Sequence, residues 1–239
     1  MFPILKKEFN SFFSSSIAYL VIGVFLVING LFLWVFKSDY NILNAGFADL
    51  NTYFYLAPWV FLFLIPAITM KSFADEFNNG TIEILKTRPI NDWQIVLGKF
   101  FASLLLTIVA LIPTLTYVYT VSSLGNPVGN IDFGSTIGSY IGLLFLASTY
   151  TAIGLYTSTL SKNQIIAFIL GVFITLFLFY GFDAIANSFA DNSYTIQQFG
   201  MYEHFKSISR GVIDTRDILY FISVTIFFLF MTKLQLKNE

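Results

Sequence analysis

His204, the only histidine of this sequence, is its one evident candidate for acid–base chemistry. A lone catalytic base needs a nucleophile, and none is evident in the polar stretch around His204. The chain has no Cys, which excludes disulfides and thiolate metal sites, and a single His excludes a multi-histidine metal site. No G-x-G-x-x-G follows a strand, and neither a G-x-x-x-x-G-K-[ST] loop nor an H-E-x-x-H pair occurs. We therefore expect no catalytic residue, no metal and no cofactor in this chain.

The charged residues that stand out lie in segment 71–99, KSFADEFNNGTIEILKTRPINDWQIVLGK, between two apolar runs. Its pattern predicts a helix that continues past Glu76 until Gly80, where glycine supplies a left-handed stop. A short helix is predicted over Thr81–Lys86, with Thr81 as its cap. This segment is predicted to be a helical elbow that projects from two spanning helices.

The second half of the elbow has its own start and stop residues. Pro89 ends the short helix, because the residue before a proline is pushed to extended geometry. Asn91 and Gln94 have capping-box spacing, which predicts a new helix that enters the membrane with Lys99 extended to the interface. Apolar side chains displayed on a rigid tip favour a protein partner. The apolar residues of the short helix are Ile82, Ile84 and Leu85.

Composition identifies the class of protein. Of 239 residues, 56% are hydrophobic and 11% are charged, and the net charge is -1. Soluble domains have about 25% charged residues. A near-zero net charge gives no basic face for nucleic acid, so the expected environment is a lipid bilayer.

Six apolar runs approach the ~20 residues that a membrane-spanning helix needs. We expect an all-α membrane protein that forms a single transmembrane domain over 1–239, with spans at about 17–36, 52–70, 100–119, 137–160, 165–182 and 218–236. No Asp, Glu, Lys, Arg or His lies within the apolar runs, the last of which ends at Thr232. A signal peptide is the alternative for the first run, but the run is too long and lacks a cleavage site.

Lys and Arg give the orientation, since positive residues in short loops favour the cytoplasm. With the N-terminus inside, nine of these residues lie in inner segments and four in outer segments. Both termini and the elbow 71–99 are therefore expected in the cytoplasm. The stretch before the first span has Phe2, Leu5, Phe9, Phe12 and Phe13 at helical spacing, with Lys6, Lys7 and Glu8 pointing elsewhere, which predicts an amphipathic helix on the inner leaflet.

Small residues recur every four positions at the fourth span, as Gly134, Gly138 and Gly142. This spacing allows two helix backbones to approach closely in lipid, either within the bundle or in a dimer. The outer segment 183–217 is predicted to contain a short helix that rests on or dips into the outer face. Asp214 is predicted to cap the sixth span.

Several residues of the elbow form a spaced pattern: Glu76, Gly80-Thr81, Glu83, Leu85, Thr87, Pro89-Ile90 and Gly98-Lys99. The pattern resembles the E-x-x-x-G-T-x-E-x-L-x-T-x-P…G-K signature of type 2 ABC transporter permeases, and the resemblance covers the whole chain. Phe77 departs from it, because many members have Arg or Lys there.

The resemblance implies that the short helix is a coupling helix that docks on a separate ABC ATPase subunit, which carries ATP and Mg. The residues that would form or support this contact are Glu76, Gly80, Thr81, Ile82, Glu83, Ile84 and Leu85. Simple helix punctuation remains an alternative for Gly80, and a solvated charged face for Glu76 and Glu83. The resemblance also implies a second permease, identical or not, and a bacterial inner-membrane location.

A narrower resemblance is to the permease subunits of gliding-motility ABC transporters, which implies a possible auxiliary membrane-anchored subunit. The residues that carry it are Phe12-Phe13-Ser14-Ser15, Ile17-Ala18-Tyr19, His204-Phe205, Ser209 to Asp214, Arg216-Asp217 and Tyr220-Phe221.

The placement of charged residues distinguishes between functional classes of membrane protein. A secondary transporter usually needs ionisable residues at membrane depth, which the apolar runs lack. An ATP-driven, exporter-type permease is favoured, and an ATPase-driven mechanical or regulatory complex that moves no substrate is the alternative. Polar residues that could line a path, or equally bond helices together, are Asn29, Thr116, Tyr117, Ser148 and Tyr150.

Overall fold

The computed structural model describes residues 1–44, 46–87, 89–188 and 193–238, and every regular element in them is a helix. Among these residues, six helices are long and apolar enough to cross a membrane. The prediction of an all-helical protein with six spans is thus confirmed. The six are Ile17–Val35, Asn51–Asn78, Asp92–Leu124, Phe133–Thr159, Gln164–Ala186 and Thr215–Lys237.

Short and irregular helices complete or connect these spans. In chain order the elements are α1 (Phe2–Ser14), α2 (Ile17–Gly30), η1 (Leu31–Val35), η2 (Ile42–Asn44), α3 (Asn51–Thr69), α4 (Lys71–Asn78), α5 (Thr81–Lys86), α6 (Asp92–Leu111), η3 (Ile112–Thr114), α7 (Leu115–Leu124), α8 (Phe133–Thr159), α9 (Gln164–Leu176), η4 (Phe177–Gly181), α10 (Phe182–Ala186), α11 (Ser193–Gln197), α12 (Met201–Ser209) and α13 (Thr215–Asn238).

The third helical unit extends well beyond the predicted range 100–119, because it has 33 residues from Asp92 to Leu124. Pro113 does not end it, since the chain passes the proline in one turn of 3-10 helix, η3. The start of the sixth span agrees with its predicted cap, because the amide of Arg216 donates to Asp214 Oδ1 at 2.9 Å.

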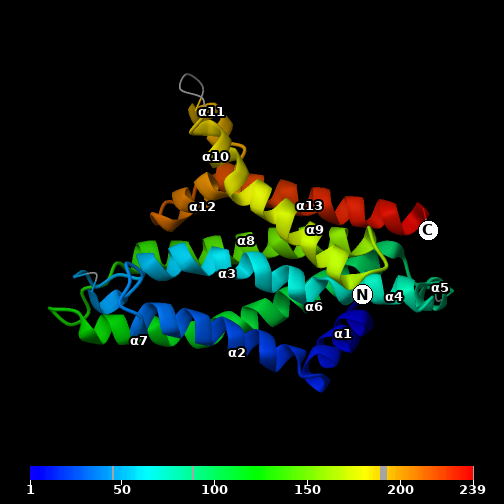
Figure 1. The fold of residues 1–239 in the computed structure, drawn as a ribbon, viewed down its shortest axis with the longest axis horizontal. Coiled ribbons are helices and arrows are strands. Elements are labelled where there is room, and N and C mark those ends of the chain that lie inside the picture. The colour runs from blue at the N-terminus through cyan, green and yellow to red at the C-terminus, as the bar shows by residue number, and fades with distance from the viewer. Residues whose placement is uncertain (45, 88, 189–192, 239) are drawn as a thin grey trace.

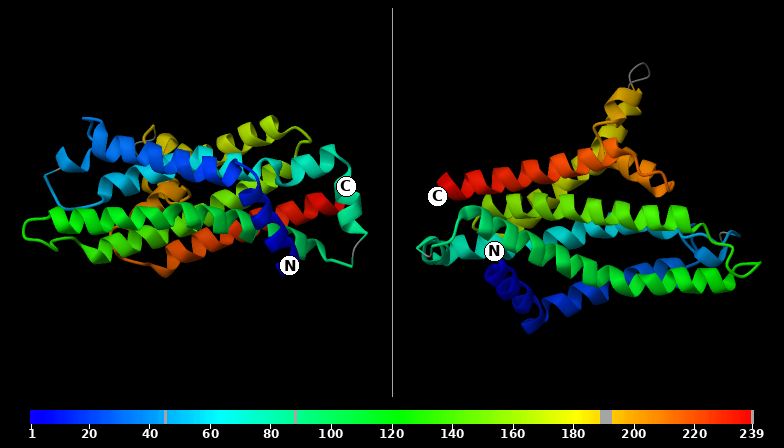
Figure 2. Two further views of the ribbon diagram at one scale, coloured as in Figure 1. Left: turned by 90° about the horizontal axis from the view of Figure 1, so that it is seen from below. Right: turned by 180° about the vertical axis from the view of Figure 1, so that it is seen from behind.

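Helix α8 is the centre of the bundle, and α3, α6, α9, α12 and α13 pack around it (Figure 1). Both chain ends lie at the end of the bundle that carries α4 and α5, and the α2–α3 and α7–α8 connections lie at the opposite end (Figures 1 and 2). The segment of α10 and α11 projects to one side (Figure 1). The chain ends and the elbow thus share one end of the molecule.

Helix α1 bends away from α2 and packs against α6. Its buried stripe is Ile4 and Phe12, with the largely buried Glu8 between them. Phe2 is exposed. The predicted facing was wrong for Glu8, since positions four apart share one helix face and Glu8 shares that of Ile4 and Phe12.

Candidate functional site

The elbow is a bent helical arm at the end of the bundle that holds both termini (Figure 1). Helix α4 continues α3 past Met70, and Gly80 then has a φ of +66°. Because a Cβ is strained at such angles, glycine ends α4 here. The helix α5 over Thr81–Lys86 follows as predicted.

Two hydrogen-bonding groups fix the ends of the elbow helices. The Thr81 hydroxyl donates to the Glu76 carbonyl at 3.5 Å. The prediction that Thr81 caps α5 was wrong. Thr81 is the first residue of α5, and its hydroxyl donates to an exposed carbonyl of α4 instead. The capping box of α6 is confirmed, because Asn91 Oδ1 accepts from the Trp93 amide and the Asn91 amide donates to Gln94 Oε1, both at 3.3 Å.

The side chains that the structure describes at the tip of the elbow are more polar than the sequence suggested. Ile82 is only 7% exposed and packs into the chain's own core, so it is not displayed to a partner as predicted. Gly80, Thr81 and Glu83 are exposed. The side chains of the two other predicted contact residues, Ile84 and Leu85, lie outside the part of the chain that the structure describes.

Glu76 and Lys99 form a buried ion pair at the base of the elbow. Lys99 Nζ lies 2.8 Å from Glu76 Oε1, and the Lys99 side chain is 2% exposed. The prediction that Lys99 extends to the interface was wrong, because α1 and α4 cover it and supply carboxylates. The carboxylate of Glu76 also faces inward. Glu76 can therefore support the elbow from within, but it does not present its carboxylate to a partner at the tip.

The same amine has further partners in α1 and α4. It donates to the Ser72 carbonyl at 2.7 Å and to Glu8 Oε1 at 3.3 Å. It also lies 5.0 Å from the centre of the Phe73 ring, a favourable position for a cation. The sequence analysis missed Glu8, although its place on the Ile4 face of α1 was a usable signal.

A polar contact ties the elbow to the fifth helical unit. The Gln164 amide at the start of α9 donates to Asp75 Oδ1 in α4. A cavity of about 360 Å³ opens beside it, lined by Asp75, Asn78, Lys162, Asn163, Gln164 and Ile165. The elbow is therefore joined by the chain to α3 and α6 and by this hydrogen bond to α9, and α4 also packs against α8.

A family model described as an ABC-2 family transporter protein matches residues 2–234, which include the whole elbow. The chain belongs to this family. Among curated proteins, none is a significant match to the chain. Members of the ABC-2 family are membrane permeases that work in general with a separate ABC ATPase, so this permease is a multi-pass membrane subunit and not the ATPase itself.

The polar residues predicted to line a path make no direct contact with one another among the described residues. They are Asn29, Thr116, Tyr117, Ser148 and Tyr150, and no hydrogen bond or ring contact joins any two of them within the described residues. Asn29 donates to the Phe25 carbonyl of its own helix at 2.8 Å. Tyr150 is fully buried, and its hydroxyl has no partner among the described residues. Direct contacts among these residues therefore do not mark a path within one chain, and their role as path residues stays a prediction.

A different polar cluster, missed by the sequence analysis, joins α3, η3 and α8. The Tyr53 hydroxyl donates to Thr114 Oγ1 at 3.1 Å, and the Tyr140 hydroxyl donates to the Thr114 carbonyl at 3.0 Å. The sequence carries no clear signal for it, because Pro113 frees a carbonyl in the preceding turn, whereas the carbonyl that accepts here belongs to Thr114, after the proline.

The glycine repeat of α8 receives the short helix α12. A Cβ on Gly138 would lie 2.7 Å from the Ile208 carbonyl oxygen, and one on Gly142 would lie 3.1 Å from the Phe205 ring. A Cβ on Gly211 would lie 3.1 Å from the Gly134 carbonyl carbon. The close packing is thus within the chain, and Gly138 and Gly142 are covered and not available to a dimer partner.

His204 fastens α12 to α13. Its Nδ1 lies 2.7 Å from Asp217 Oδ1, its Nε2 lies 2.8 Å from the Gln198 carbonyl oxygen, and its ring stacks on Tyr220 with centroids 4.0 Å apart. On the same helix, burial first and the neighbouring Tyr55 second raise the pKa of the Tyr202 phenol. These contacts indicate a structural role for His204 and give no nucleophile for catalysis.

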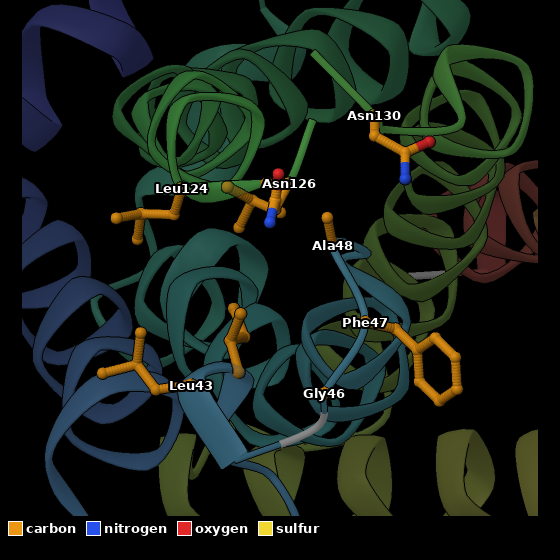
Figure 3. A pocket seen from close by; sticks show the side chains of 10 residues that line it. Leu43, Gly46, Phe47, Ala48, Leu124, Asn126 and Asn130 are labelled. Carbon is orange, nitrogen blue, oxygen red and sulfur yellow. The ribbon is translucent and has the colours of Figure 1, made fainter. Parts of the chain in front are cut away.

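A cavity of about 350 Å³ opens at the end opposite the elbow, between the α2–α3 and α7–α8 connections (Figure 3). Ala48 and Asn126 lie beside it, and the ring of Phe47 points away from it (Figure 3). Phe47 is 78% exposed. This end therefore presents an apolar side chain beside an open cavity.

Proposed function

We propose that this permease is the membrane subunit of an ATP-driven, exporter-type ABC complex, and that a separate ATPase docks on the tip of its elbow. The observation that carries the proposal is the construction of the elbow. An exposed tip with Gly80, Thr81 and Glu83 stands on a base held by the buried pair of Glu76 and Lys99. A displacement of this tip by the docked ATPase is transmitted to the spanning helices, because the buried ion pair holds the base of the elbow in place.

ATP and Mg belong to the partner ATPase in this proposal, and the elbow lies in the cytoplasm together with both chain ends. The shared position of the termini and α5 at one end of the bundle supports this arrangement (Figure 1). The excess of Lys and Arg in the segments at that end supports it as well. The membrane is then the bacterial inner membrane.

The absence of charged residues from the apolar runs indicates which energy source drives the complex. The apolar runs contain no ionisable residue that could couple a proton or sodium gradient. ATP binding to the docked ATPase has to favour one of two states of the assembly, and a complete switch from 1:99 to 99:1 needs about 5.5 kcal/mol. ATP on the docked subunit is the source that we assign.

The complex has two permeases, identical or different, and we assign it to gliding motility on the residues that carry the narrower resemblance. In this proposal the elbow binds the ATPase, so a further subunit needs a different surface. The open end with Phe47 is the surface that we assign to an auxiliary membrane-anchored subunit, because its exposed apolar ring lies away from the elbow.

Co-purification with the ATPase tests the docking proposal. Glu83→Arg and Leu85→Asp are expected to reduce recovery of the ATPase from detergent-solubilised membranes. Glu203→Arg, an exchange on α12 away from the elbow, is the matched control and is expected to leave recovery unchanged. Full recovery and full stimulation of ATP hydrolysis in both elbow variants would contradict docking at α5.

The alternative is an ATPase-driven mechanical complex that moves no substrate, and the absence of charged residues from the apolar runs is compatible with it as well. Reconstituted vesicles distinguish the two. ATP turnover that depends on the permease, without any translocated species, would support the mechanical complex.

A further inference from the structure

The amine of Lys99 uses all three of its donors on groups from two other helices. A lysine ammonium has three N–H donors and no acceptor. Those of Lys99 are directed to the Ser72 carbonyl at 2.7 Å, Glu76 Oε1 at 2.8 Å and Glu8 Oε1 at 3.3 Å. One buried cation on α6 therefore holds both α4 and α1.

The residue before it allows this contact. A Cβ on Gly98 would lie 2.8 Å from Ile4 Cγ2 and 3.3 Å from the Met1 carbonyl oxygen. Ordinary side chains do not fit at such distances, so α1 reaches α6 only because position 98 is glycine. Gly98 provides the close approach and Lys99 the ionic tie, and together they seat α1 at the base of the elbow.

Each of the three joined helices leads into a different span. Helix α4 continues α3, α6 is the start of the third span, and α1 leads into α2 through Ser15 and Ser16. The Ser15 hydroxyl donates to the Phe12 carbonyl at 3.0 Å and fixes that joint. The inner ends of three spans therefore meet at one amine.

We propose that Lys99 is a positioning residue that makes α1 part of the elbow, so that a displacement of α5 moves the inner ends of α2, α3 and α6 together. This inference rests on the proposed function for the source of the displacement. Without the clamp, α1 would remain at the membrane surface while α4 and α5 moved, and α2 would not follow. Glu8 is the group that specifically brings α1 into the unit.

Spin-label distances test the clamp in the full-length permease in lipid nanodiscs, without any ATPase. The chain has no cysteine, so Asn10→Cys on α1 and Glu83→Cys on α5, both exposed positions, accept unique labels. We expect a narrow distance distribution that broadens and shifts in Lys99→Met and is restored in Lys99→Arg, which keeps the charge. A distribution in Lys99→Met that coincides with the parent would overturn the clamp.

Glu8→Gln is a second test of the clamp, which remains usable if Lys99→Met does not fold. It removes one charged partner of α1 and leaves the contact of Lys99 with Glu76 in place. The Asn10 to Glu83 distribution should broaden in Glu8→Gln and stay narrow in Lys6→Gln, an exposed control on the same helix. Equal distributions in the two variants would overturn the role of Glu8.

The assembled complex separates this inference from the proposed function. The moving label of the elbow is here placed on Asn79→Cys, an exposed position between α4 and α5 that is not among the predicted ATPase contacts. A reference label on Phe133→Cys, an exposed position on α8, reports movement of the Asn10 and Asn79 labels when ATP is added. Both should move in the parent, and only the Asn79 label should move in Glu8→Gln. An Asn79 label that moves in the parent while the Asn10 label stays overturns the inference alone. An Asn79 label that ignores ATP overturns the proposed function and the inference with it.

Discussion

Lys99 Nζ lies 2.8 Å from Glu76 Oε1, although the two residues are 23 positions apart and both side chains are largely buried. The acid and the lysine of the permease signature are thus partners of each other. This pairing changes the role of Glu76 from a contact at the surface of the elbow to the support of its base. In the docking that we propose, contacts to the ATPase then fall to exposed groups such as Glu83.

Glu76→Gln is expected to destabilise the permease, because it weakens the pairing of a buried amine. Breaking a buried ion pair by removing one partner costs about 3–5 kcal/mol, whereas removing an exposed pair costs less than about 1 kcal/mol. The measurement is the free energy of unfolding in mixed micelles. Glu203→Gln is the control, since the pair of Glu203 and Lys206 is half-exposed with a separation of 3.6 Å. A similar loss in both variants would contradict the buried pair.

A double-mutant cycle gives the pair its own test. Glu76→Gln with Lys99→Met should destabilise the permease less than the sum of the two single changes, because the second change removes the charge that the first leaves poorly paired. Additive losses of unfolding free energy would mean that the two side chains act independently.

Gly138→Ala is expected to loosen the contact of α12 with α8. Its new Cβ would meet the Ile208 carbonyl oxygen at 2.7 Å, and such overpacking costs about 1–3 kcal/mol. Gly23 on α2 has no atom within 4 Å of its Cβ position, so Gly23→Ala is the matched control and should be neutral or stabilising. Thermal unfolding followed by tryptophan fluorescence would compare them, and equal midpoints would contradict the packing.

Gly80→Ala is expected to distort the elbow without touching a neighbour. No atom lies within 4 Å of its Cβ position, but its φ of +66° costs a residue with a Cβ about 1–2 kcal/mol. Gly80→Asn should be milder, because asparagine tolerates this region better. Recovery of the ATPase should fall in the order Gly, Asn, Ala, and a reversed order would show that backbone geometry is not the cause.

Local signals made much of the elbow predictable. The left-handed glycine, the helix from Thr81 to Lys86 and the capping box at Asn91 each depend on residues within a few positions of one another. The burial of Lys99 and Ile82 was not predictable, because it depends on where α1 and the rest of the core lie. The glycine repeat predicted a close approach in the same way, but nothing local indicated that α12 would be the helix that approaches.

His204→Phe is expected to free α12 from α13 while it keeps the ring that stacks on Tyr220. Both ring nitrogens of His204 face oxygens, at 2.7 Å on Asp217 and 2.8 Å on the Gln198 carbonyl, and phenylalanine replaces neither hydrogen bond. A hydrogen bond to a charged group contributes about 1.5–3 kcal/mol. Amide hydrogen exchange across α12 should therefore increase many-fold in His204→Phe and stay unchanged in the elbow. Lys206→Gln on the same helix is the control, and equal protection of α12 in the two variants would contradict the fastening role of His204.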